Sequence, residues 1–247
     1  MFIKLAIGNL QSAMNLYVGT SGFSYKEWKG SFYPASIPAK DMLSYYASRF
    51  QAVELNNTFY RLPQKSMIEN WKAQVPDNFR FSVKASQGIT HFRRLKDAAY
   101  ATRLMLERVS AFEDRLGVVF FRLPPDMKKD VKRLETFLKT LPADVPAAFQ
   151  LEDSTWVDDE VLALLRSQNR ALCVVDTDEM PDRDIDKTAD WGYMRLRRVK
   201  YSDSELKKWI ARMRAQEWKR TFVFFKHEDE GTGPKLAARF LNLASPI

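Results

Sequence analysis

The sequence predicts a single-domain α/β protein in which eight parallel strands close into a (β/α)8 TIM barrel. Two observations support this fold. Short apolar, β-rich runs alternate with amphipathic helical patterns along the chain, which indicates strand–helix–strand units in a parallel sheet. Eight such repeats of roughly thirty residues each account for the chain, and this number favours closure over an open, doubly wound sheet.

The predicted strands are short and recur at regular intervals. They comprise residues 16–19, 52–58, 79–85, 117–123, 147–152, 171–176, 192–196 and 221–226. Helical patterns follow most of them, at residues 40–50, 64–75, 98–115, 128–141, 159–168, 203–216 and 235–243. The sixth helix is predicted to be short or irregular, because residues 180–190 are acidic and contain a proline.

The barrel is expected to occupy residues 16–247. Residues 1–15 form a predicted N-terminal extension that is either disordered or the product of an upstream start, since Met14 directly precedes the first strand. This extension lacks the apolar core of a signal peptide, and no segment approaches the ~20 apolar residues of a membrane span. The single cysteine, Cys173, excludes an intrachain disulfide and fits a reducing compartment. We therefore expect a cytoplasmic protein that does not contact the membrane.

The formal net charge of +8 favours polyanionic partners, and nucleic acid is one candidate. The alternative is that the Lys and Arg residues simply cover solvated helix faces. No run of five like charges is present, so the sequence contains no basic tail.

The polar residues of the predicted strands fall on one parity and alternate with apolar residues, which predicts a shared polar interior. In parallel barrels, chemistry is located at the carboxyl ends of the strands. The predicted polar set comprises Glu54, Asn56, Thr58, Ser82, Lys84, Arg122, Gln150, Glu152, Asp176, Tyr193, Arg195 and Lys226. Its four cations outnumber its three carboxylates, which favours a small anionic ligand. The alternative is a set of architectural buried ion pairs.

Three residues are the catalytic candidates. Glu54 is a candidate general base because it faces inward at a strand end. A nearby Lys84 would lower the pKa of Glu54 and weaken it as a base, and the pair would then be structural. His91, in the loop after the third strand, is either an acid–base group or fixes its loop by a hydrogen bond.

The predicted binding residues surround these candidates. They are Tyr25, Asn56, Arg122, Gln150, Glu152, Trp156, Asp176, Tyr193, Arg195, Lys226 and His227. Aromatic rings beside cations suit sugars or nucleobases that carry phosphate, although long loops also bury their aromatics to stay ordered. No cofactor is predicted. A divalent metal ion is disfavoured, because the surrounding cations repel it and the sequence has no compact ligand motif.

Several stretches are similar to the YecE-like family, a group of uncharacterised proteins also called domain of unknown function seventy-two. The chain resembles it in GTSGFSY at residues 19–25, VELNNTFYRLP at 53–63, LPP at 123–125 and YSD at 201–203. The resemblance covers nearly the whole chain from residue 16 onward. It implies a TIM barrel with a polar cavity at the strand ends, and it implies no established activity. The matching cavity positions are Glu54, Asn56, Lys84, His91, Asp176 and Arg195.

The chain departs from this family pattern on the fourth, fifth and eighth strands, and also after Arg195, where Arg197 and Arg198 replace a usual His-Gly. Where the family usually reads Glu-Phe-Arg-His, this chain has residues 150–153, which are Gln, Leu, Glu and Asp. Arg122 stands where the family usually has Gln, and Lys226 stands where Asn is expected. The cavity is therefore rebuilt, and either its specificity has changed or an ancestral activity has been lost.

Two functional hypotheses follow. In the first, the protein is an enzyme that acts on a phosphorylated sugar, nucleotide or nucleic-acid fragment by hydrolase, lyase or isomerase-like chemistry. In the second, it is a non-catalytic barrel that binds nucleic acid or a metabolite. The sequence does not determine the reaction or the oligomeric state.

Overall fold

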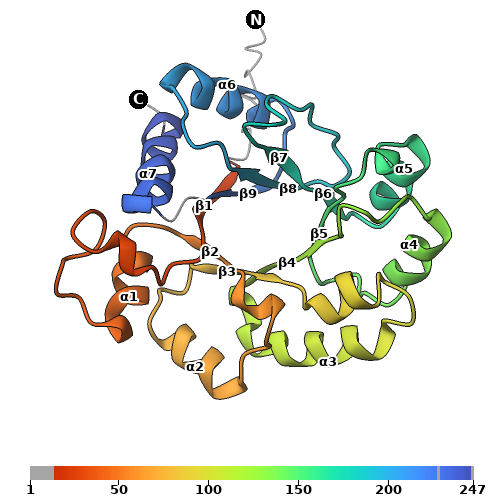
Figure 1. Ribbon diagram of the computed structural model, residues 1–247, viewed down its shortest axis with the longest axis horizontal. Coiled ribbons are helices and arrows are strands. Elements are labelled where there is room, and N and C mark those ends of the chain that lie inside the picture. Colours follow the sequence, from red (N-terminus) through yellow and green to blue (C-terminus); the bar gives the residue numbers. More distant parts are fainter. Residues whose placement is uncertain (1–13, 227–228, 246–247) are drawn as a thin grey trace, which may run out of the picture.

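Nine parallel strands form one sheet that curls into a nearly closed barrel, surrounded by helices (Figure 1). This architecture comes from a computed structural model, which describes residues 14–226 and 229–245. The strands are β1 (Asn15–Ser21), β2 (Ala52–Leu55), β3 (Arg80–Lys84), β4 (Leu116–Arg122), β5 (Ala147–Gln150), β6 (Ala171–Leu172), β7 (Val174–Asp176), β8 (Gly192–Leu196) and β9 (Arg220–Phe225). Their order in the sheet is β6-β5-β4-β3-β2-β1-β9-β8-β7.

The predicted eight-stranded barrel is confirmed, because β6 and β7 are two halves of the sixth predicted strand. β6 pairs with β5, and β7 pairs with β8. Cys173, which separates the halves, still donates its backbone N–H to the carbonyl of Phe149 on β5. β6 and β7, the first and last strands in the sheet order, are therefore joined directly through Cys173. This connection brings the two edges of the sheet together.

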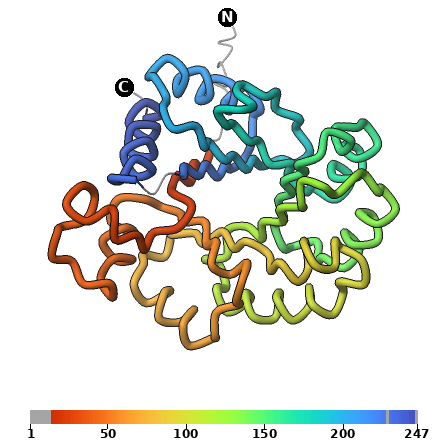
Figure 2. Tube along the Cα trace, viewed as in Figure 1, coloured from red at the N-terminus to blue at the C-terminus, as the bar shows by residue number. Residues whose placement is uncertain are grey.

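Helices follow most of the strands and pack on the outside of the barrel, and the chain can be traced around it in Figure 2. The α-helices are α1 (Met42–Ala47), α2 (Lys65–Ala73), α3 (Ala99–Val109), α4 (Val131–Leu138), α5 (Asp159–Ser167), α6 (Asp203–Arg214) and α7 (Thr232–Ala244). The short turns that matter for the site are η3 (Asn57–Phe59), the π-helical η4 (Gly88–Phe92) and η6 (Ser154–Trp156).

The sixth connection contains no α-helix. Residues 177–191, between β7 and β8, are all described and are bends, turns or irregular. Asp182 within this segment has a φ of 58°, and its carboxylate pairs with Lys208 of α6 at 2.8 Å. The prediction of a short or irregular sixth helix is therefore confirmed, and side chains of α6 hold the segment instead.

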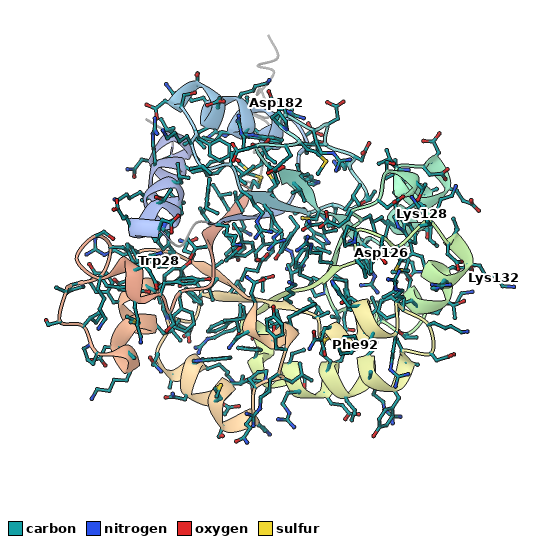
Figure 3. All side chains as sticks on the ribbon, viewed as in Figure 1. Trp28, Phe92, Asp126, Lys128, Lys132 and Asp182 are labelled. Carbon is teal, nitrogen blue, oxygen red and sulfur yellow. The ribbon has the colours of Figure 1, made fainter. Side chains whose placement is uncertain are left out.

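Strand alternation divides the buried residues into two cores. One lies between the barrel and its helices, and the other fills the barrel itself. Side chains occupy the space inside the ring of strands in Figure 3. The interior core includes Ala52, Val118, Phe120, Ala148, Ala171, Cys173, Val175, Tyr193, Phe222 and Phe224. This set shows which residues of each strand point into the barrel. Polar residues two positions further along the same strand therefore also point inward.

Local sequence signals explain several of these elements. α6 begins with a capping box, in which Ser202 and Glu205 satisfy each other's backbone N–H groups. α4 and α5 begin at Asp130 and Asp158, whose carboxylates accept from backbone N–H groups of the first turn. Gly19 of β1 is required by close packing, because a Cβ there would lie 1.8 Å from the carbonyl oxygen of Ala52.

Candidate functional site

Glu54, on β2, lies at the centre of a hydrogen-bonded network inside the barrel. Its side chain has no exposed surface. Oε1 accepts hydrogen bonds from Ser21 Oγ at 2.8 Å, Asn56 Nδ2 at 3.0 Å and Arg195 Nη2 at 2.8 Å. Oε2 accepts from the hydroxyl of Tyr193 at 2.6 Å. The donors come from β1, the turn after β2 and β8, so the carboxylate ties together distant segments of the chain on one side of the barrel.

The charge of Glu54 is stabilised by these contacts. Burial alone raises its pKa, but the positive charge of Arg195 and the hydrogen bond from Tyr193 outweigh burial and lower that pKa to about 2. Burial and the neighbouring carboxylate raise the pKa of Tyr193 well above its ordinary value, so the phenol stays protonated and donates. Because its proton goes to Glu54, Ser82 Oγ is the donor in the 2.8 Å bond to Tyr193.

Arg195 and its neighbours carry the network across the barrel. Its guanidinium lies over the ring of Phe120, 4.7 Å from the centroid, and Nη1 donates to Gln150 Oε1 at 2.8 Å. Gln150 Nε2 donates in turn to Glu152 Oε1 at 2.6 Å. Arg122 Nε donates to the same carboxylate oxygen at 2.5 Å. The chain from Glu54 to Arg122 therefore alternates in charge, with the amide of Gln150 at its middle.

These contacts also explain the rebuilt fifth strand. The sequence resemblance implies a Glu at position 150, a Gln at 122 and an Arg at 152. In this chain the amide is at position 150, the cation at 122 and the carboxylate at 152. The contacts of Gln150, Glu152 and Arg122 leave none of these three side chains without a polar partner. The changed residues therefore compensate for one another.

Lys84, at the end of β3, has a different environment from Glu54. Its Nζ lies 4.1 Å from the centroid of the Phe59 ring, and no carboxylate of the described residues lies within 4 Å of it. His91, in η4, meets the same ring edge-on with centroids 4.8 Å apart, and its Nδ1 lies 2.9 Å from Thr90 Oγ1. The hydrogen bond to Thr90 is the loop-fixing contact that the sequence left as one of two alternatives for His91.

Positive charges in this region lower the pKa values of Lys84, Arg197 and His91. Burial, together with the charges of Arg195 and Arg122, lowers the pKa of Lys84 to about 8. Burial and the charge of Arg195 lower the pKa of Arg197 to about 10. Burial and the charge of Lys84 lower the pKa of His91, which is therefore neutral at pH 7. Positive charges on or next to β3, β4 and β8 therefore lie close enough to affect one another.

A cavity of about 580 Å³ opens at the carboxyl ends of β4, β5, β7, β8 and β9. Its lining carries three cations, Arg122, Arg197 and Lys226, and four carboxylates, Glu152, Asp178, Glu179 and Asp229. Gln150 forms part of its floor. The expected bowl of cations is therefore more mixed than predicted, because the loops after β7 and β9 contribute acids that strand parity did not indicate.

Asp176 does not lie in this cavity, contrary to the prediction. The inward residues at the sixth strand position are Ala171, Cys173 and Val175, so Asp176 faces outward. Its carboxylate accepts from Arg198 Nε at 2.9 Å, Tyr201 OH at 2.7 Å and Trp209 Nε1 at 3.2 Å. Asp176 therefore anchors α6 to the barrel. Because β6 and β7 are apolar on both faces, alternation gave no parity signal there.

Trp156 and Tyr25 are also placed differently from the prediction. Trp156 is 1% exposed and donates its Nε1–H to the carbonyl of Met127 at 2.6 Å, so it packs in the outer core. The ring of Tyr25 packs at a tilt against Trp28, which is labelled in Figure 3, and its hydroxyl donates to the carbonyl of Ser21 at 2.7 Å. The alternative that loop aromatics are buried to order the loops is supported for Trp156, whereas Tyr25 is only half-buried.

The second strand ends earlier than predicted. β2 stops at Leu55, and Asn56 begins the η3 turn instead of continuing the strand. Asn56 nevertheless reaches Glu54, while Thr58 Oγ1 donates to the carbonyls of Leu55 and Lys84. Asn56 and Tyr25 also line a separate cavity of about 660 Å³ between the loop after β1 and α2. The two residues therefore lie at the edge of the mouth, away from Arg122 and Lys226.

Two residues that the sequence reasoning missed belong to the site. Ser21, at the end of β1, donates to Glu54, and Arg197 lines the cavity two residues beyond Arg195. Extending the inward parity of each strand by one step would have identified both residues. His227 and residues 1–13 lie outside the described residues. Within residues 14–226 and 229–245, no group of three or more His, Cys, Asp or Glu side chains is arranged to hold a metal ion.

A family model described as "Protein of unknown function DUF72" matches residues 17–246, which is almost the whole chain. The chain belongs to the DUF72 family. A DUF72 protein of known structure from Thermotoga maritima is 27% identical, with a TM-score of 0.81 over 93% of this chain and 98% of that one. A second, from Enterococcus faecalis, has a TM-score of 0.74 at 18% identity and covers 93% and 95% of the two chains.

Two curated relatives carry the family name UPF0759. The protein YunF of Bacillus subtilis is 25% identical over 69% of this chain and 64% of its own length. The protein YecE of Escherichia coli is 29% identical over 52% of this chain and 45% of its own length. The alignments thus span about half to two thirds of these DUF72 relatives. None of these names states an activity. In the part of the chain that the structure describes, no helix combines the length and apolar character needed to cross a membrane.

Proposed function

We propose that this DUF72 protein binds, and processes, a small phosphorylated polyhydroxy compound in the cavity at the strand ends. The observation that supports this is the cluster of cations that depress one another's pKa values, above all Lys84 and Arg197. Cations that are fixed close together repel one another, which is unfavourable for the folded protein. A bound anion would offset that repulsion. An anionic ligand would therefore bind more tightly than a neutral ligand of the same shape.

The carboxylates that share the cavity with these cations suggest the rest of the ligand. Asp178, Glu179 and Asp229 accept hydrogen bonds and repel anions, so they suit hydroxyl groups. A compound that carries both a phosphate and hydroxyl groups matches this mixed lining. A sugar phosphate or a nucleotide has this arrangement, and a volume of about 580 Å³ is within the range of small-molecule sites.

Within this proposal, Glu54 is a positioning residue. A carboxylate with four donors and a pKa of about 2 does not accept a proton readily near neutral pH. It instead fixes Arg195 and Tyr193 beneath the cavity. Lys84 and His91 do not line this cavity, but both lie close enough to Arg122, which does, for its charge to lower their pKa values. They are therefore the candidates to move protons.

The test is calorimetric titration of the protein with ribose 5-phosphate, inorganic phosphate and ribose. We expect ribose 5-phosphate to bind and ribose to bind at least tenfold more weakly. Arg122→Gln, which inserts the residue usual in the family, should weaken ribose 5-phosphate binding about tenfold, because one charge-assisted contact is lost. Arg103→Gln is the matched control, since Arg103 is a 67% exposed residue on α3. Equal affinities for the two variants and the wild type would contradict the proposal.

Nucleic acid is the second candidate ligand, favoured by the net charge of +8. A single-stranded oligonucleotide bound along the surface would lose affinity steeply and log-linearly with salt concentration. A phosphate held by two or three cations of the cavity would lose much less. Titrations at 50 and 200 mM salt, repeated with Arg122→Gln, therefore separate the two ligand classes.

A further inference from the structure

Lys84 has the surroundings of a reactive amine rather than those of an ion-pair partner. It faces inward at the carboxyl end of β3 and is only partly exposed. Its strand end is fixed, because Thr58 Oγ1 donates to the Lys84 carbonyl at 2.7 Å. The aromatic face of Phe59 lies beside its Nζ, and none of the described carboxylates comes within ion-pair distance. The carboxylates nearest to this region, Glu54 and Glu152, already pair with Arg195 and Arg122.

The neighbouring charges favour the neutral form of this amine. Besides burial, the guanidinium groups of Arg195 and Arg122 lower the pKa of Lys84 to about 8, although Glu54 partly opposes them. Roughly a quarter of such a lysine is neutral at pH 7.5, against roughly a thousandth of an ordinary exposed lysine. A lysine that is desolvated and placed next to other cations is a recognised form of activated nucleophile.

We infer that Lys84 forms an imine with the carbonyl carbon of a phosphate-bearing aldehyde or ketone. This inference rests on the proposed function, because Lys84 lies outside the cavity lining but close enough to Arg122 to feel its charge, and a phosphate on Arg122 would hold the carbonyl group on the side of Lys84. It also restricts the substrate class from phosphorylated polyhydroxy compounds in general to those with a free carbonyl group. Carbon–carbon or carbon–hydrogen bonds next to that carbon are then the bonds whose cleavage the imine would assist.

The covalent step balances without any oxidant or reductant. The neutral Nζ adds to the carbonyl carbon, and the electron pair of the C=O bond moves to oxygen, which takes a proton. The nitrogen loses one proton to give the carbinolamine. The hydroxyl group then takes a second proton and leaves as water while the nitrogen lone pair forms the C=N bond, and the nitrogen gives up its last proton to leave the neutral imine, so that two protons pass in all from nitrogen to oxygen. His91 is the candidate carrier of these protons, since its ring meets the same Phe59 ring edge-on and its lowered pKa favours the neutral imidazole.

The experiment is reductive trapping. The full-length protein is incubated at pH 7.5 with dihydroxyacetone phosphate or glyceraldehyde 3-phosphate, the imine is reduced with cyanoborohydride, and the adduct is located by intact mass and peptide mapping. We expect one adduct per chain, on Lys84. Lys84→Arg should abolish it, and Lys139→Arg, at an exposed lysine of α4 paired with Glu135, should leave it unchanged. Thermal unfolding of Lys84→Arg confirms that the variant is folded.

The outcomes separate this inference from the proposed function. If calorimetry shows binding of dihydroxyacetone phosphate but trapping labels no lysine, or labels many surface lysines equally, the imine is wrong and the phosphate site stands. If dihydroxyacetone without phosphate labels Lys84 as efficiently as its phosphate ester, the phosphate site is wrong. Arg122→Gln should raise the concentration of phosphate ester needed for half-labelling about tenfold. No change in that concentration would contradict the link between the phosphate site at Arg122 and imine formation at Lys84.

Discussion

Glu54 and Lys84 lie near the ends of neighbouring strands and both point into the barrel, yet their charges have opposite environments. Glu54 has no exposed surface, and its two oxygens accept from four donors. Lys84 has a ring beside it and guanidinium groups nearby, with no carboxylate of the described residues in ion-pair contact. Both pKa values are lowered as a result. The low pKa of Glu54 keeps its carboxylate charged, whereas the lowered pKa of Lys84 brings its amine closer to the neutral form. A buried charge with partners holds the fold together, whereas a poorly partnered one is available to a ligand.

The largest expected effect is on the paired charge. Glu54→Gln should reduce the free energy of unfolding by about 3–5 kcal/mol, because it leaves the Arg195 guanidinium buried without a counter-charge. Urea denaturation at pH 7 measures this. Glu135→Gln is the matched control, since Glu135 is 46% exposed and pairs with Lys139 on the surface. It should cost less than about 1 kcal/mol. Equal losses for the two variants would mean that the Glu54 network does not stabilise the barrel.

Acid should remove the same stabilisation more gradually. The pKa of Glu54 is lowered from 4.5 to about 2 on folding, so the folded protein binds fewer protons at this group than the unfolded chain between these values. Its stabilisation is therefore fully present above pH 4.5 and is lost as the pH falls to 2, with a size of about 3 kcal/mol. The difference in unfolding free energy between wild type and Glu54→Gln should shrink over this range. A difference that stays constant from pH 6 to pH 3 would contradict the assignment.

The smallest expected effect has the opposite sign. Lys84→Met should increase the free energy of unfolding at pH 7 by about 1 kcal/mol, because it removes a partly buried cation that other cations repel. The pKa of Lys84 is lowered from 10.5 to about 8, so the wild type gains stability as the pH rises from 8 to 10.5 and the advantage of the variant fades. Lys139→Met, at the exposed pair with Glu135, is the control and should change stability little. If Lys84→Met instead lowered the free energy of unfolding, Lys84 would be a residue that stabilises the fold, and the prediction would be wrong.

Much of the site could be predicted from strand parity. Glu54, Lys84, Arg122, Gln150, Tyr193 and Arg195 all continue the inward parity of their strands, and all belong to the network or the mouth. Parity could not place Asp176, because its strand is apolar on both faces and offers no contrast. It also could not separate Trp156 from the mouth, because loop residues have no fixed period.

The amino-acid sequence by itself determined the repeating strand–helix pattern, the family and the face of each strand that turns inward. These are local properties, since period-two alternation is set by the pleat of the backbone. Only the tertiary structure decided that Arg195, and not Lys84, neutralises Glu54, and that acids from two loops share the cavity with the cations. Pairing between residues about 140 positions apart depends on the stagger of strands around the closed barrel, which no local pattern encodes.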